Sequence, residues 1–185
     1  AEELGVTVVP LSVLFGEEAY KDGVEITREA FFDRLVNGNV HPKTSQPSVG
    51  DFAAVYKELT DQGHEIVSVH IADKLSGTLN SARAAKLDLP EATITLVDSA
   101  TAALALGLVV KATAEAAQAG KTHAEVVAVA EDAAEKTEAY VILETLTYLQ
   151  KGGRIGKAQA LIGGLLSVKP ILTIKDGEIL PHEKV

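Results

Sequence analysis

The sequence predicts an α/β fold, in which a parallel-sheet three-layer α/β domain is followed by the start of a second α/β domain with antiparallel strands. Short β-branched runs alternate with longer helical segments, which is typical of a parallel sheet covered by helices on both faces. Near the end of the chain, two apolar runs flank an Asp-Gly pair, which favours an antiparallel hairpin. The change of pattern places a domain boundary near residue 138, between an N-terminal domain of residues 1–138 and the beginning of a C-terminal domain, residues 139–185.

The first elements are indicated by β-branched residues and by helix-capping patterns. A β-branched run at residues 4–15 predicts a buried strand. Thr27 stands before an apolar stripe that stops at Asn37-Gly38, and together these features predict a capped amphipathic helix. Ser48, followed three residues later by Asp51, indicates a capping box at the start of the next helix.

The rest of the chain repeats this alternation. A loop and an alanine-rich helix to about Leu87 follow a strand at residues 66–71. The further predicted elements are, in chain order, a strand at 93–97, helices at 102–119 and 122–136, a strand at 140–143 and a hairpin at 171–180. The sequence places antiparallel pairing in this last hairpin and none in the first part of the chain.

Composition excludes several classes of function. The chain has 185 residues, of which 17 are Lys or Arg and 26 are Asp or Glu, so its formal net charge is -9. Without a basic stripe it cannot neutralise the phosphates of a nucleic acid, so no nucleic-acid partner is expected. Because Cys is absent, disulfides and thiolate ligands or nucleophiles are excluded.

Membrane insertion and secretion are not expected either. Lys111 and Lys169 interrupt the longest apolar runs, which are too short for a membrane span. The start Ala1-Glu2-Glu3 lacks the basic residues of a signal peptide, so a cytoplasmic location is expected. The absence of Met, and an end directly after a predicted hairpin strand, indicate a fragment of a longer protein.

Two hydroxyl-rich segments stand in front of predicted helices. Thr44 and Ser45 belong to the first, and Ser76, Gly77 and Thr78 to the second, which follows a predicted strand. Helix N-termini favour anions because their N–H groups lack partners, and open α/β sheets bind ligands at the carboxyl ends of their strands. Capping is the more frequent use of such a segment alone. If the two loops converge, their hydroxyls and N–H groups predict a site for a carboxylate or a phosphate.

Other kinds of chemistry have weaker support. Ser76 as a nucleophile lacks a G-x-S-x-G elbow, and the histidines show no motif spacing. No metal-binding or nucleotide-binding motif occurs, so no metal and no cofactor is expected. Asp98 and Ser99 end a predicted strand at the same sheet edge as Ser76 and are secondary candidates, although turn capping is the commoner role of such a pair.

Two cations, Lys151 and Arg154, flank a glycine pair after a short helical segment. Cations at a helix C-terminus compensate the helix dipole, and this structural role is the more frequent one. The alternative is a docking point for a partner, because Arg154 projects from a turn in an acidic protein. The residues alone leave both interpretations open.

Taken together, the motifs resemble the DegV family, bacterial proteins that include the fatty acid-binding subunit of fatty acid kinase. The similarity extends over the whole chain, and the ordered set is far more specific than any single motif. The residues that carry it are Val8-Val9-Pro10-Leu11, Tyr20-Lys21-Asp22-Gly23, Thr44-Ser45-Gln46-Pro47-Ser48, Leu75-Ser76-Gly77-Thr78 with Ser81-Ala82, Asp98-Ser99, Tyr148-Leu149-Gln150-Lys151-Gly152-Gly153-Arg154-Ile155 and Lys169-Pro170-Ile171-Leu172.

The resemblance implies a carrier without catalysis of its own. In that family a fatty acid lies between two α/β domains, and hydroxyls hold its carboxylate. A separate ATP-dependent fatty acid kinase subunit then phosphorylates the carboxylate, and the acyl phosphate enters phospholipid synthesis. Carried over to this chain, Thr44, Ser45 and Ser76, with Gly77 and Thr78, hold the carboxylate of a long-chain fatty acid.

The same resemblance assigns Arg154, and with it Lys151, to docking of the kinase. The chain departs from the family pattern because it lacks the first strand and roughly the last third. Asp73 also stands where the family usually has serine, which adds a negative charge near the proposed anion site. A serine-dependent hydrolase, or a sensor module for another small anionic ligand, remains the alternative.

Overall fold

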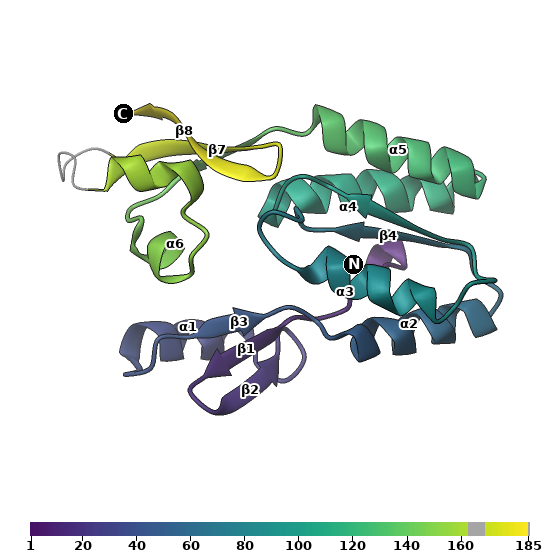
Figure 1. Cartoon of the computed structure of the whole chain (residues 1–185), viewed down its shortest axis with the longest axis horizontal. Helices are drawn as coiled ribbons and strands as arrows, with labels where there is room; N and C mark the ends of the chain where they lie inside the picture. Colours follow the sequence, from purple (N-terminus) through teal and green to yellow (C-terminus); the bar gives the residue numbers. More distant parts are fainter. Residues whose placement is uncertain (163–168, 185) are drawn as a thin grey trace.

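A computed structural model describes residues 1–162 and 169–184 of the protein (Figure 1). The helices are α1 (Arg28–Asn37), α2 (Val49–Asp61), α3 (Thr78–Leu87), α4 (Ala103–Gln118), α5 (His123–Lys136) and α6 (Thr147–Lys151), with 3₁₀ segments η1 (Glu2–Leu4) and η2 (Gly156–Leu161). The strands are β1 (Ser12–Phe15), β2 (Glu18–Lys21), β3 (Lys43–Ser45), β4 (Ile66–His70), β5 (Ile94–Asp98), β6 (Ala139–Ile142), β7 (Pro170–Lys175) and β8 (Glu178–Lys184). In the described residues they form a β2-β1-β3 sheet, a β4-β5 pair and a β6-β7-β8 sheet.

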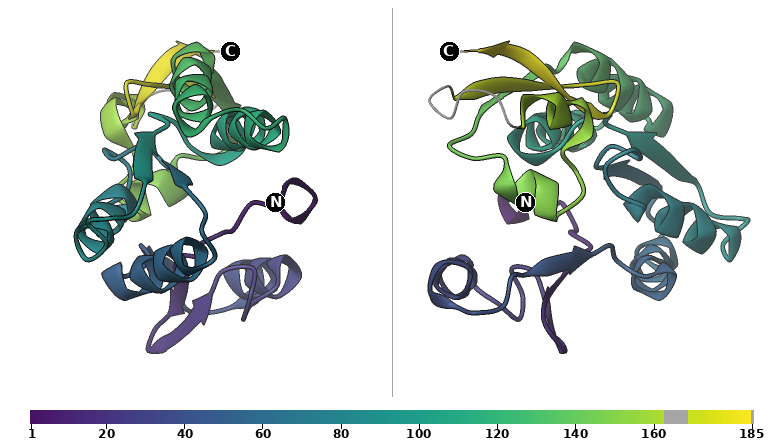
Figure 2. Two further views of the ribbon diagram at one scale, coloured as in Figure 1. Left: turned by 90° about the vertical axis from the view of Figure 1, so that its right-hand side faces the viewer. Right: turned by 60° about the vertical axis from the view of Figure 1, so that its left-hand side comes forward.

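The parallel pair of β4 and β5 lies between two layers of helices. The strands pair from Ile66 opposite Ile94 to His70 opposite Asp98, and their β-branched residues suit this buried position. Helices α2 and α3 cover one face of the pair, and α4 and α5 cover the other (Figures 1 and 2). The buried residues that these helices contribute include Phe52, Tyr56, Ala82, Ala85, Val109 and Ala130. This layered arrangement confirms the predicted α/β class.

The predicted helix starts after Thr27 and Ser48 are confirmed. Thr27 Oγ1 accepts a hydrogen bond from the Ala30 N–H (3.2 Å). At Ser48 both halves of the capping box form, because Ser48 Oγ accepts from the Asp51 N–H (3.1 Å) and the Asp51 carboxylate accepts from the Ser48 N–H (2.8 Å). Lys21 Nζ also donates to Asp51 (2.9 Å), which ties β2 to α2. The Lys21 and Ser48 hydrogen bonds lower the pKa of Asp51 to about 2.

The N-terminal strand is much shorter than predicted. Of residues 4–15, only β1 pairs as a strand, and it runs antiparallel to both neighbours, with Ser12 opposite Lys21 of β2 and Ser45 of β3. The prediction that the first part lacks antiparallel pairing is therefore wrong. β-Branched residues favour an extended backbone, but a strand also needs a partner. The turn at Gly16 (φ 67°) brings β2 back only along the end of the run.

The C-terminal hairpin forms as predicted. β7 and β8 pair around Asp176 and Gly177, whose φ values of 51° and 75° belong to a two-residue turn that suits the twist of the strands. β6 begins at Ala139 and pairs with β7, so the strands after residue 138 form a sheet of their own. The division into domains at residue 138 stays a prediction.

The hairpin turn rests on the loops that follow β4 and β5. The Gly177 N–H donates to the Ala100 carbonyl (3.1 Å). A Cβ placed on Gly177 would lie 3.3 Å from the Ala72 Cβ. Beside the turn, Glu178 lies 4.0 Å from the Lys74 ammonium group across the same contact. The turn therefore joins the last sheet to the edge of the parallel pair.

A buried chain of hydrogen bonds links α2 to β4. Tyr56 OH donates to Ser68 Oγ (2.8 Å), and Ser68 Oγ shares a hydrogen bond with His70 Nε2 (2.9 Å). Ser68 Oγ donates to Nε2 or accepts from it, depending on which nitrogen of the imidazole carries the proton. His70 is 4% exposed, and this burial lowers its pKa to about 4 against an opposing effect of Asp98.

We expect His70 to make the protein less stable in acid. Because its pKa in the folded state lies below the ordinary value of 6.5, the unfolded chain binds the proton first as the pH falls. The free energy of unfolding is expected to be unaffected by His70 above pH 6.5 and to fall by about 3 kcal/mol between pH 6.5 and 4. Urea unfolding at a series of pH values measures this loss.

Two variants isolate the contribution of His70. The loss between pH 6.5 and 4 is expected to shrink in His70→Gln. It is expected to persist in His64→Gln, which changes an exposed histidine. The same pH dependence in all three proteins would contradict the prediction.

Gly177→Ala is expected to destabilise the protein more than Gly153→Ala. Both glycines have a left-handed backbone, with φ values of 75° and 72°, so alanine costs roughly 1–2 kcal/mol at either position. A new Cβ contacts Ala72 at Gly177, whereas nothing lies within 4 Å at Gly153. The additional loss in free energy of unfolding for Gly177→Ala, about 1 kcal/mol in urea unfolding, measures how closely the turn packs against Ala72. Equal losses would show that the turn is not held there.

Candidate functional site

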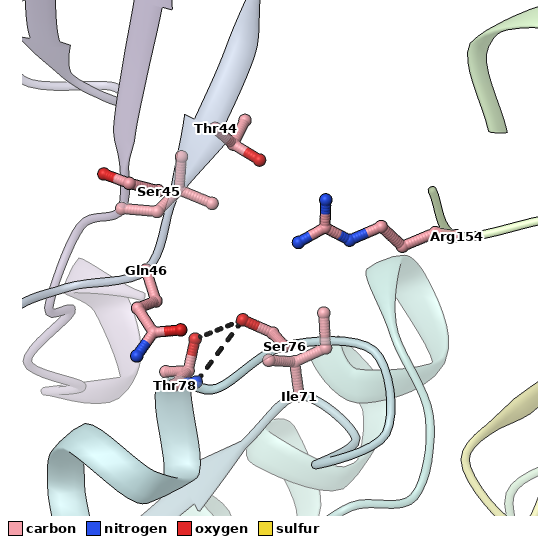
Figure 3. A pocket seen from close by; sticks show the side chains of 8 residues that line it. Thr44, Ser45, Gln46, Ile71, Ser76, Thr78 and Arg154 are labelled. Atoms are coloured by element: carbon pink, nitrogen blue, oxygen red, sulfur yellow. Dashed lines mark hydrogen bonds between the residues drawn. The ribbon is translucent and has the colours of Figure 1, made fainter. Parts of the chain in front are cut away.

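One cavity collects most of the residues that the sequence singles out. Its volume is about 350 Å³, which lies within the usual range for ligand sites. It is bounded by β3, the loop after β4, the start of α3 and the loop after α6 (Figure 3). The lining residues are Leu11, Thr44, Ser45, Gln46, Ile71, Ser76, Thr78 and Arg154.

The β3 side of the cavity presents one hydroxyl inward. Pairing with β1 sets Thr44 opposite Val13 and Ser45 opposite Ser12. Successive side chains of a strand point to opposite faces, so neighbouring residues cannot present their side chains in one direction. In Figure 3 the Thr44 hydroxyl points towards Arg154, whereas the Ser45 hydroxyl points away from it. Thr44 is therefore the better placed of the two to contact a ligand.

The α3 side of the cavity combines two hydroxyls with a helix N-terminus. Ser76 Oγ and Thr78 Oγ1 share a hydrogen bond of 2.7 Å, and the Thr78 N–H donates to Ser76 Oγ over a longer 3.4 Å. Gly77 is the N-cap of α3 and contributes no side-chain cap. The helix dipole favours an anion at this end, where the Thr78 N–H contacts Ser76 Oγ and the Asn80 N–H donates to the Gly77 carbonyl.

Arg154 brings positive charge to the cavity. Its Nε donates to the Leu75 carbonyl (3.3 Å) and its Nη1 to the Gly152 carbonyl (2.6 Å). The guanidinium group points towards the space between Thr44 and Ser76 (Figure 3). Among the described residues, the lining contains this one cation and no carboxylate. The site is therefore electrostatically suited to an anion.

Arg154 also borders a second hollow of about 410 Å³. In that hollow Glu178 accepts a hydrogen bond from Lys157 (2.9 Å) and lies 4.0 Å from Lys74. Lys157, and to a smaller extent Lys74, lower the pKa of Glu178. The lysines of the second hollow are therefore engaged by a carboxylate, whereas Arg154 contacts carbonyl oxygens.

The structure brings the five residues predicted to hold a carboxylate to one place. Thr44, Ser45, Ser76 and Thr78 line the cavity, and Gly77 lies between the last two at the start of α3. Their role as ligands stays a prediction.

The remaining candidates lie outside the lining. Asp98 accepts a backbone hydrogen bond within its own turn (2.8 Å), and Ser99 is 1% exposed, so both fit the capping role. Lys151 ends α6 and is not among the lining residues. The Asp73 carboxylate is paired with Arg83 (3.4 Å) and does not line the cavity.

Four lining residues were not among the predicted ligands, namely Leu11, Gln46, Ile71 and Arg154. Gln46 lies within the first hydroxyl-rich segment, and Ile71 follows β4 directly, so position in the chain carries a signal for both. Arg154 was predicted to dock a partner. Its place in the cavity depends on tertiary contacts that have no local pattern.

The described residues form neither a metal-binding cluster nor a membrane-spanning helix. Within residues 1–162 and 169–184, no three His, Cys, Asp or Glu side chains gather closely enough to hold a metal ion. In the same part of the chain, no helix has the length and apolar character needed to cross a membrane.

Comparisons with known sequences place the chain among bacterial relatives. The family model described as "Uncharacterised protein, DegV family" matches residues 1–185. A DegV domain-containing protein of Clostridium perfringens is 40% identical over 189 residues, which cover 100% of this chain and 66% of that protein.

Solved structures give the same result. A DegV family protein from Thermus thermophilus, described by its fatty acid binding, has a TM-score of 0.91 and 38% identity, with 100% of this chain and 65% of that chain covered. A stearic acid-binding protein from Eubacterium ventriosum has a TM-score of 0.88 and 34% identity, with 100% and 65% covered. This chain spans just under two thirds of the length of these relatives. With a matching family model, relatives and fold, the chain belongs to the DegV family.

Proposed function

We propose that the protein is a fatty acid carrier that holds a long-chain fatty acid and presents its carboxylate to a partner kinase in the cytoplasm. The observation that carries this proposal is the convergence of Thr44, Ser76, Thr78 and Arg154 on one cavity. The fatty acid binding described for the relatives from Thermus thermophilus and Eubacterium ventriosum supports it. No catalytic role is assigned to the chain itself.

The hydrogen bonds of the α3 side leave a donor for the carboxylate. Ser76 and Thr78 share one hydrogen bond, in which either hydroxyl is the donor. One of the two protons is used in that bond, and the other remains to donate to a ligand. With the Thr44 hydroxyl on the opposite side, a carboxylate in the cavity has neutral donors from two directions. Hydrogen bonds to a charged group are worth about 1.5–3 kcal/mol each.

Affinity and orientation come from different parts of the ligand. An alkyl chain gains about 0.8 kcal/mol for each buried CH₂ group, so the tail of a long-chain fatty acid supplies most of the binding energy. The hydroxyl cluster then decides which end of the ligand stays at the cavity. Neutral donors also leave the carboxylate more nucleophilic than a tight ion pair would, which suits its phosphorylation.

Arg154 fits a role at the contact with the kinase. It is exposed, and hydrogen bonds to two backbone carbonyls orient it beside the proposed carboxylate position. A kinase that brings ATP to the carboxylate therefore meets this guanidinium group, which can bind phosphate oxygens with two parallel hydrogen bonds. Lys151, three residues earlier, extends the positive charge on the same segment.

No specific observation favours a serine hydrolase. In the described residues, the side-chain hydrogen-bond partner of Ser76 is Thr78, whereas a nucleophile needs a base within hydrogen-bond reach. The buried His70 is engaged by Ser68 instead.

The full-length protein, purified under native conditions, is expected to contain a bound long-chain fatty acid that mass spectrometry detects. Thr44→Val and Ser76→Ala are each expected to raise the Kd for stearate about tenfold or more, because a hydrogen bond to the carboxylate is lost. Thr93→Val, which changes an exposed threonine, serves as the matched control and is expected to bind like the wild type.

Three results would contradict the carrier function. Wild-type protein free of lipid is the first. A phosphate or small dicarboxylate that raises the melting temperature where stearate does not would indicate a sensor module. Covalent labelling of Ser76 by a serine-reactive probe would indicate a hydrolase.

Arg154→Gln is expected to separate fatty acid binding from phosphorylation. The variant is expected to retain most of its affinity for stearate, because hydroxyls and the tail provide it. Acyl phosphate formation with the kinase subunit and ATP is expected to fall at least about tenfold, as for the loss of a central interface arginine. Lys57→Gln, on an exposed turn of α2, is the control. Unchanged phosphorylation in Arg154→Gln would remove Arg154 from the kinase contact.

A further inference from the structure

The two sides of the cavity belong to different parts of the fold, and one side chain connects them. Gln46 follows β3, and its Nε2 donates to Ser81 Oγ in the second turn of α3 (2.9 Å). Ser81 is 6% exposed, so its hydroxyl is shielded from water. Loss of the hydrogen bond from Gln46 would therefore leave Ser81 Oγ without this partner, which costs free energy. The hydrogen bond joins residues that are 35 positions apart in the sequence.

Gly77 leaves open the space that the Gln46 side chain occupies. Its backbone, with φ -71° and ψ 11°, is one that alanine adopts without strain. A Cβ at this position would overlap Gln46 Oε1, and it would lie 2.9 Å from both Cδ and Nε2 of Gln46. The glycine is therefore explained by the space that the Gln46 amide occupies, and its conformation alone does not require it.

The position of β3 makes such a connection necessary. β3 is an edge strand of the β2-β1-β3 sheet, and all three of its residues are exposed. The buried core of that sheet is centred on Val13, Phe15 and Ile26 and does not include β3. Apolar packing therefore does little to fix the distance from Thr44 to the start of α3.

We propose that Gln46 is a positioning residue for the anion site, which sets the spacing between Thr44 and the Ser76–Thr78 pair through its contacts with Ser81 and Gly77. The inference rests on the proposed function, because the spacing matters only if one carboxylate bridges the two sides. Gln46 acts through its neighbours and is not itself assigned as a ligand. Its amide lines the cavity next to Thr78, as Figure 3 shows.

The test compares two ligands with the same tail. Stearate and 1-octadecanol share an alkyl chain and differ in the head group, so the ratio of their Kd values reports recognition of the carboxylate. Substitution of a residue with a merely structural role would weaken the binding of both ligands equally. Substitution of a residue that positions the anion site would weaken the binding of stearate alone. The measurements use the full-length protein after its bound lipid has been removed.

Gln46→Ala and Ser81→Ala are each expected to raise the Kd for stearate about tenfold, the equivalent of one lost charge-assisted hydrogen bond. The Kd for 1-octadecanol is expected to change less than about twofold. The double variant is expected to resemble either single variant, because both remove the same connection. Gln62→Ala, an exposed glutamine at the end of α2, is the matched control and is expected to behave as wild type.

Gly77→Ala provides an independent arm that alters neither Gln46 nor Ser81. Its Cβ displaces the Gln46 amide, so the ratio of the Kd for stearate to the Kd for 1-octadecanol is expected to rise as in Gln46→Ala. In a Gln46→Ala background the space is open, and Gly77→Ala is expected to add less than about twofold. This non-additivity separates displacement of Gln46 from damage to the helix start, which would persist in both backgrounds.

The outcomes distinguish the inference from the proposed function. If wild-type protein binds stearate no better than 1-octadecanol, or binds neither, the carboxylate site itself is refuted. If wild-type protein prefers stearate and the variants of Gln46 and Ser81 keep that preference, the anion site stands and the positioning role of Gln46 is refuted. Equal weakening of both ligands refutes it as well.

Discussion

The parallel pairing of β4 with β5 is the constraint on which the rest of the structure depends. Both strands run in the same direction from Ile66 and Ile94, so both end at the same edge of the pair. The loop with Ser76 and the loop with Ala100 must therefore meet there. Helices α2 to α5 bury the faces of the pair, which leaves this edge as the place where other segments attach. The cavity and the hairpin turn both lie at this edge because open α/β sheets expose their loops there.

A small number of polar contacts brings distant segments to that edge. The Gly177 N–H holds the last sheet at Ala100 (3.1 Å), Arg154 is bonded to the Leu75 carbonyl (3.3 Å), and Gln46 is bonded to Ser81 (2.9 Å). Each contact is a single hydrogen bond, so each contributes on the order of 1 kcal/mol. Such contacts do little to stabilise the fold as a whole. Their effect is to select one relative position of segments that would otherwise be loosely placed. The proposed carboxylate site depends on this selection, because the proposal places donors on two sides of the ligand.

Local signals made much of the fold predictable from the sequence. The capping box of Ser48 and the Asp176-Gly177 turn each involve residues within a few positions, and both form as predicted. β3 was not predictable, because Lys43–Ser45 is polar and exposed throughout and shows no apolar alternation. The hydroxyl segments were found in the sequence because residues before helices are recognisable. The position of Arg154 in the cavity was not predictable, since its contact with Leu75 joins residues 79 positions apart. Sequence patterns thus revealed the components of the site, whereas its assembly depends on tertiary contacts.

The most direct measurement of the central claim is a crystal structure of the full-length protein with its natively bound ligand. The proposed function predicts a fatty acid whose carboxylate oxygens lie within hydrogen-bonding distance of Thr44 Oγ1 on one side and of the Ser76–Thr78 pair on the other. It also predicts that the Arg154 guanidinium borders this head group. A fatty acid whose carboxylate lies elsewhere, or a different anion between Thr44 and Ser76, would contradict the claim.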